Sequence, residues 1–356
     1  MDKIKELSSR TSLLVSVAAL VVIIAGIYLA QSVVVLFLVA MFLAILGAPP
    51  LLWLKAKRIP SGLAVTIVMA VMILLLLLVG AQTAASVSNF LNELPLLQSR
   101  IREQALQFSL SLAAKGIIIN ESVFQQFVNP GSVMRLTAGL LAGVSSALSD
   151  LLLILLTVTF ILLEVSSFPV KLRSILGDPL QAFPQFTMFV INMKRYMVLK
   201  TIINLIAGVI ITVWMQILGV QFPVLWGFLA FLLHYIPNIG AVIAAIPAAL
   251  MALVQLGPGS ALMVIGGNIF VGFVIGNVVE PRLMGRRLGL STLVVFLSLL
   301  LWGSLLGIMG AILCIPLTMT LKFAFECNED TRWISMLLGP ENAEAFSVPI
   351  PNKKKP

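Results

Sequence analysis

Residues 11–30 decide the fold class of this chain. They are TSLLVSVAALVVIIAGIYLA and contain no charged side chain. About 20 apolar residues, at 1.5 Å per helical residue, cross the hydrocarbon core of a bilayer, so this stretch predicts a membrane-spanning helix. A secretory signal peptide is the alternative, because Lys3, Lys5 and Arg10 precede the run. A signal core is usually shorter, however, and here a second apolar run follows at once.

The overall composition also indicates a membrane protein. Of the 356 residues, 60% are hydrophobic and 10% are charged, whereas an ordinary soluble domain carries about 25% charged residues. A single soluble domain of this length could not bury such an excess, so lipid must act as part of the solvent. Soluble enzymes, secreted disulfide scaffolds and nucleic-acid partners are therefore disfavoured. With two cysteines and the single histidine His234, we expect neither a metal site nor a cofactor.

Further apolar runs along the chain predict more spanning helices. They are separated by polar or Gly/Pro-containing connectors, which is the pattern of an all-α polytopic integral membrane protein. We expect three N-terminal helices within 1–82, a C-terminal bundle within 145–326 and a cytoplasmic tail at 327–356. About six full spans are expected, at 11–30, 33–54, 61–81, 151–163, 201–219 and 260–279.

Residues 83–144 differ from the spans in composition. Between Val87 and Ile101, apolar residues recur every three or four positions with polar residues between them, which predicts an amphipathic helix. Helices packed on the membrane surface or on the spans are one interpretation, and a lid over a permeation path is the other.

The basic residues predict the orientation. Nineteen of the 23 Lys and Arg lie before the first span, in three connectors that include 166–200, or from Lys322 onward. Because cytoplasmic loops are enriched in Lys and Arg, we expect both termini and the 166–200 connector inside, and the 83–144 segment outside.

Two apolar stretches, 222–256 and 290–321, are interrupted by helix breakers. Pro237 and Gly240 interrupt the first, and Gly303, Gly307 and Gly310 interrupt the second. Each is either a re-entrant hairpin or a pair of complete helices. Backbone groups freed at a break must face a protein-enclosed or watery cavity, which makes broken helices the best sequence indication of a transport site. The alternative is two kinked hairpins with a purely structural role.

The two interruptions continue alike, as GAVIAAIP at 240–247 and GAILCIP at 310–316. Either an internal repeat or chance similarity between apolar segments explains this likeness.

Few polar side chains fall at membrane depth, and each has two interpretations. Glu280 is either part of an ion-pair network with neighbouring arginines or a proton or cation relay. His234 either satisfies the broken backbone or senses pH. Asn residues suit hydrogen bonds between helices or to a neutral solute. We take His234, Pro237, Asn238, Gly240, Asn268, Asn277, Gly303, Gly307 and Gly310 as transport-path candidates, and Glu280, Arg282, Arg286 and Glu164 as coupling or gating candidates.

Several motifs, YIPNIG at 235–240, GNVVEPRLMGR at 276–286 and LGLSTLVV at 288–295, resemble those of the autoinducer-2 exporter family, also called the PerM-like permeases. The similarity extends over nearly the whole chain, and His234 is the departure, where an uncharged amide is expected. The resemblance implies a transporter in the bacterial inner membrane that exports the signal autoinducer-2 in quorum sensing, as a homo-oligomer, specifically a pentamer.

Three functions are compared on this basis. The first is secondary or facilitated export of a small neutral polar signal, with the signal, membrane lipid and further subunits as partners. The second is sodium/proton antiport, which some relatives are credited with, and the third is a non-transporting scaffold or sensor. An enzyme is not expected, because the phosphate-binding, zinc-protease and serine-hydrolase motifs are absent from the sequence.

Overall fold

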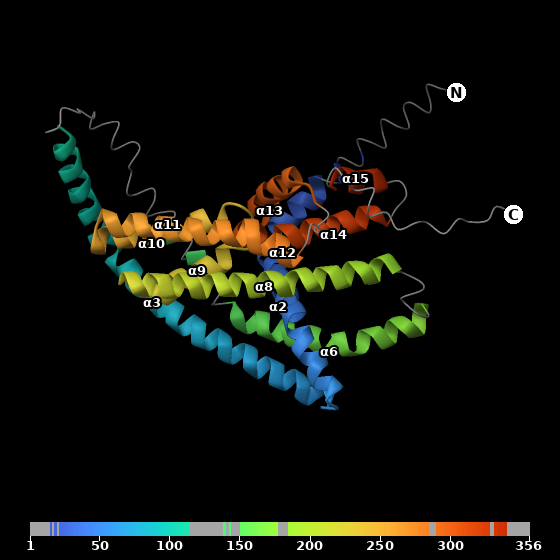
Figure 1. Ribbon diagram of the computed structural model, residues 1–356. Coiled ribbons are helices and arrows are strands. Elements are labelled where there is room, and N and C mark those ends of the chain that lie inside the picture. The colour runs from blue at the N-terminus through green and yellow to red at the C-terminus, as the bar shows by residue number, and fades with distance from the viewer. Residues whose placement is uncertain are drawn as a thin grey trace, which may run out of the picture.

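The computed structural model describes residues 21–113, 150–176, 184–284, 290–327 and 331–339, with a few single positions before 21 and between 138 and 143. Within these ranges all regular structure is helical. Figure 1 shows α8, α10 and α11 running side by side, with α3 along the bundle. The all-α class is therefore confirmed.

The N-terminal part is built from α2 (Gln31–Ala56), α3 (Ser61–Ala113) and α6 (Leu151–Leu176). Small residues of α2, Ala40 and Ala44, are buried in a cluster that also holds Val68 of α3 and Val158 of α6. Small side chains allow close approach of helices where lipid supplies no hydrophobic driving force. Of the expected first span, 11–30, residues 21–29 are helical.

Helix α3 crosses the expected boundary at residue 82 without a break. Its 53 residues continue from the apolar span into the amphipathic segment, because a change from apolar to polar residues does not by itself end a helix. Figure 1 shows its C-terminal turns extending beyond α10 and α11. The rest of the amphipathic segment, from residue 114 to 137, lies outside the described residues.

The expected 166–200 connector is largely helical. Helix α6 ends at Leu176, and α8 (Pro184–Leu218) begins eight residues later. Lys200, the last residue of the expected connector, is inside α8 and only 5% exposed.

The C-terminal bundle places short helices between long ones. Helices α9 (Pro223–Leu233) and α10 (Gly240–Leu256) are followed by α11 (Pro258–Val274), a π-helical turn η1 (Ile275–Val279) and α12 (Glu280–Met284). Proline at the first position of α9 and α11 suits a helix start, where the missing N–H has no helical partner. The chain ends with α13 (Thr292–Ile312), α14 (Cys314–Glu326) and the short α15 (Arg332–Leu337).

Five helices in the described part are long and apolar enough to cross a membrane, namely Gln31–Ala56, Ser61–Phe90, Met188–Leu218, Pro258–Leu283 and Thr292–Ile312. Helix α9 is not, because its 11 residues extend only about 16 Å against a hydrocarbon core of about 30 Å. Large apolar side chains on the spans point outward, for example Leu78 at 60% exposed. Such side chains require lipid or another subunit around them.

Candidate functional site

A cavity of about 280 Å³ lies where the break between α9 and α10 meets α8 and the end of α11. Its polar lining comes from Lys200 of α8, from His234 and Asn238 of the break, from Asn277 of η1 and from Glu280 at the start of α12. Gly240, Gly272 and Gly276 leave its wall without side chains at three points. Polar groups from three separate elements therefore converge on one site.

The break between α9 and α10 forms the cavity's first wall. Helix α9 ends at Leu233, and the chain turns through Asn238, whose φ of 62° lies in the left-handed region that Asn tolerates better than most residues. Helix α10 then returns against the end of α9, so closely that a Cβ at Gly240 would lie 1.9 Å from the Leu233 carbonyl oxygen. Glycine is required at this position because no side chain fits there.

The turn is anchored to α8 by two polar side chains. The Thr201 Oγ1 and the Tyr235 hydroxyl are 2.6 Å apart and share a hydrogen bond. With its amide oriented to satisfy both neighbours, the fully buried Asn204 accepts a bond from the Tyr235 N–H at 3.1 Å and donates to the Lys200 carbonyl at 3.3 Å. The Tyr235 N–H, which also donates to the Leu232 carbonyl at 3.3 Å, thus gains a partner on the neighbouring helix.

The second wall is the π-helical turn η1, which ends next to Glu280. Pro281 follows directly, and a proline within a helix has no N–H to donate and its ring clashes with the carbonyl four residues earlier, here that of Asn277. A wider turn relieves this clash, and the Glu280 N–H bonds the Ile275 carbonyl five residues back. Single π turns of this kind occur frequently at functional sites.

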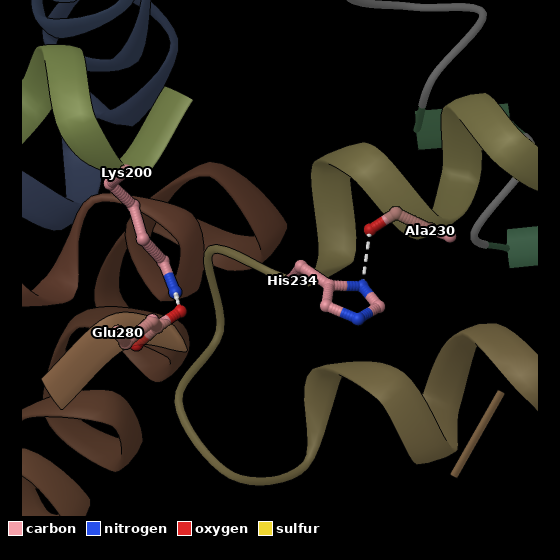
Figure 2. Close-up of polar contacts among 4 residues, drawn as sticks. All are labelled: Lys200, Ala230, His234 and Glu280. Atoms are coloured by element: carbon pink, nitrogen blue, oxygen red, sulfur yellow. Dashed lines mark hydrogen bonds and ion pairs between the residues drawn. The ribbon is translucent and has the colours of Figure 1, made fainter. Parts of the chain in front are cut away.

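An ion pair links α8 to Glu280, next to the second wall. The Lys200 Nζ donates to the Glu280 Oε1, and the two side chains are 6% and 24% exposed. Figure 2 shows the two side chains meeting end to end. Of the neighbouring arginines, Arg282 is exposed on α12, and Arg286 lies outside the described residues.

His234 contributes both to the turn and to the cavity. Its Nδ1 is 2.7 Å from the Ala230 carbonyl oxygen, one helical turn earlier, as Figure 2 shows. The side chain is 7% exposed, and Nε2 has no hydrogen-bond partner among the described residues. The ring thus makes a second contact with a carbonyl that already accepts the His234 N–H at 2.9 Å.

The second hairpin repeats the construction of the first. Helix α13 carries a non-helical residue, Gly307 with φ of 66°, and a Cβ at Gly310 would lie 2.0 Å from the Trp302 carbonyl oxygen. The Trp302 indole N–H donates to the Thr318 Oγ1 of α14 at 3.0 Å. Gly240 and Gly310 therefore occupy equivalent positions, where the returning arm touches the outgoing arm.

The sequence candidates divide into three groups. Six of them line the cavity together: His234, Pro237, Asn238, Gly240, Asn277 and Glu280. Gly303, Gly307 and Gly310 belong to the second hairpin, where Gly307 borders a larger and mainly apolar cavity of about 610 Å³ against α2 and α9. Asn268 is buried on α11 and donates to the Val264 carbonyl, whereas Glu164 is exposed on α6.

Lys200 was not among the predicted site residues. In the sequence this lysine served as a marker of orientation, although Lys200 directly precedes 18 uncharged residues of α8. A lone lysine joined to an apolar helix is a signal for a buried partner, because an unpaired charge there is costly.

A polytopic helical protein with a polar cavity at a broken hairpin has the construction of a secondary transporter, in which discontinuous helices form the substrate site. The chain belongs to the family described as AI-2E family transporter, whose model matches residues 17–328. The AI-2 transport protein TqsA of Escherichia coli is 37% identical over 332 residues, which are 93% of this chain and 96% of that protein.

Two further relatives are similar over nearly their whole lengths. The putative transport protein YhhT of Escherichia coli is 37% identical over 92% of this chain and 94% of its own. A putative transport protein of Haemophilus influenzae is 34% identical over 92% and 95%. The family resemblance is confirmed, and the protein is a multi-pass membrane transporter. These descriptions indicate transport and not catalysis, and they give no support to the antiporter or the scaffold.

Proposed function

We propose that this protein exports autoinducer-2, a small neutral polar signal, across the bacterial inner membrane, with the cavity at the first hairpin as the solute site. The single observation that carries the proposal is the convergence of Lys200, His234, Asn277 and Glu280 on one cavity at a helix break. The relative named as an AI-2 transport protein supports the choice of solute. Hydroxyl groups of such a solute suit amide, imidazole and helix-end partners.

The charge of the site supports a neutral solute. Lys200 and Glu280 carry opposite charges and pair with each other, so together they add no net charge to the cavity. We propose that this pair gates the path: a solute group or a proton that binds Glu280 separates it from Lys200 and loosens the contact between α8 and α12. Transport then depends on both residues and not on Glu280 alone.

Orientation and assembly complete the proposal. The distribution of basic residues supports cytoplasmic termini and an extracytoplasmic 83–144 segment. Outward-facing apolar side chains on the spans are compatible with neighbouring subunits, and we propose a homo-oligomer, specifically a pentamer.

Everted membrane vesicles test the proposed function. Autoinducer-2 is supplied outside, and its accumulation is followed with and without the protein, while a proton gradient is imposed or collapsed. Accumulation that needs the protein and the gradient identifies a secondary exporter, and equilibration that needs only the protein identifies a facilitator. Absence of any protein-dependent flux would refute the proposal, and sodium-driven proton movement in the same vesicles would reinstate the antiporter.

A further inference from the structure

We infer that the His234 Nε2 accepts a hydrogen bond from a hydroxyl group of the bound solute, which makes this nitrogen a specificity-determining atom for neutral hydroxyl-bearing molecules. The inference rests on the proposed function, because it assigns a ligand contact to the same cavity. Its basis is the geometry of the imidazole and the arrangement of the polar groups around it.

The contact with Ala230 fixes which ring nitrogen carries the proton. A carbonyl oxygen can only accept a hydrogen bond, and it lies 2.7 Å from the His234 Nδ1, so Nδ1 must donate. In the neutral ring the second nitrogen, Nε2, then carries a lone pair and acts as an acceptor. The turn of α9 therefore sets the hydrogen-bonding role that the imidazole presents to the cavity.

The position of Nε2 suits it for a ligand contact. The side chain lines the cavity and is 7% exposed, and Nε2 has no partner within the described part of the chain. Figure 2 shows Nε2 on the side of the ring turned away from Ala230. Gly272 of α11 lies beside it, and a Cβ added there would be in van der Waals contact with Nε2, at 3.9 Å. A buried acceptor without a partner is unfavourable, and a solute hydroxyl would relieve that cost.

Neighbouring groups of the cavity favour the same kind of ligand. Lys200 and Glu280 face the cavity as a neutralised pair, which offers no excess charge to a carboxylate, a phosphate or a borate ester. The Asn277 Nδ2 donates to the Phe273 carbonyl at 3.1 Å, which leaves the amide oxygen as its accepting group. Two neutral acceptors along one cavity match hydroxyl donors of a neutral molecule.

Two substitutions separate the roles of the two nitrogens. In His234→Asn, the amide reaches the position of Nδ1 and can keep the Ala230 bond, but nothing remains at the position of Nε2. In His234→Gln, the longer side chain places an amide oxygen near the position of Nε2. His234→Asn therefore removes the proposed contact while it retains the local turn, and His234→Gln is the matched control.

The test measures binding to the purified full-length protein by titration calorimetry. The probes are autoinducer-2 without borate, the same molecule with borate, and an analogue whose hydroxyls are methylated. We expect about tenfold weaker binding of the borate-free probe to His234→Asn, which equals about 1.4 kcal/mol, and a change below about threefold for His234→Gln. The methylated analogue should bind the wild type about tenfold more weakly and lose nothing further in His234→Asn.

Several outcomes would overturn the inference. They are equal affinities of wild type and His234→Asn, tighter binding of the borate-bearing probe, or no binding of any probe. Vesicle transport distinguishes this failure from failure of the proposed function. Transport that is unchanged in His234→Asn refutes the contact alone, whereas binding that depends on His234 without any vesicle flux supports the contact and refutes export.

Discussion

Replacing Glu280 with Gln removes one partner of a buried ion pair and tests its importance directly. The Lys200 side chain is only 6% exposed, so its ammonium group would remain buried without a counter-charge. Removal of one partner from a buried pair costs about 3–5 kcal/mol. Because Glu280 is 24% exposed and water reaches that end of the pair, we expect the lower limit, about 3 kcal/mol of unfolding free energy. The variant should still enter the membrane, but export should be lost.

The double variant Lys200→Met/Glu280→Gln separates stability from gating. Replacing both members of a buried pair by neutral groups is often close to neutral for stability, so the double variant should unfold within about 1 kcal/mol of wild type. Lys200→Met alone should be less stable than the double variant. Because we propose that the pair gates the path, export should remain absent in the stable double variant.

Stability is measured by circular dichroism as sodium dodecyl sulfate is titrated into mixed micelles, and export is measured in everted vesicles. Two results would refute the reasoning. Wild-type stability of Glu280→Gln would mean that Lys200 is not left buried and unpaired. Restored export in the double variant would show that the pair holds the fold and has no part in gating.

Two further substitutions test the first hairpin in the same micelle titration. Gly240→Ala places a Cβ 1.9 Å from the Leu233 carbonyl oxygen and should lower the free energy of unfolding by about 1–3 kcal/mol. In the control Gly266→Ala, the added Cβ meets no atom within 4 Å, so this variant should be neutral or stabilising. Equal effects of the two substitutions would contradict the close approach at Gly240. Tyr235→Phe removes the 2.6 Å hydrogen bond to Thr201 and should cost about 1 kcal/mol, and an unchanged midpoint would show that this bond does not anchor the turn.

The membrane fold and the break of the first hairpin were predictable because both depend on local sequence. An uncharged run long enough to cross a bilayer has few alternatives. Pro237 and Gly240 lie close together in an apolar run, and the structure turns between α9 and α10 at that position.

The partner of Glu280 was not predictable, because it depends on the packing of distant segments. Lys200 lies 80 residues away in sequence, and Arg282 and Arg286 are much closer. Only the packing of α12 against α8 selects the lysine. The same limit explains why Gly303 and Gly310 were grouped with the first hairpin as path candidates, although neither lines the polar cavity.

The helices continue past the expected ends of their apolar spans. These ends were placed where the apolar runs stop, at residues 81 and 163. The structure continues α3 to Ala113 and α6 to Leu176, because charged residues are good helix formers outside the bilayer. Polarity marks the edge of the membrane and not the end of a helix.

The most direct test of the central claim is to fill the cavity and measure autoinducer-2 flux in everted vesicles. Gly276 lines the cavity and has no atom within 4 Å of an added Cβ, so Gly276→Leu would occupy the space without a clash at the backbone. Gly266 has equally open surroundings and does not line the cavity, which makes Gly266→Leu the matched control. We predict that Gly276→Leu abolishes flux and Gly266→Leu retains it. Equal flux in both variants would contradict a solute path through this cavity.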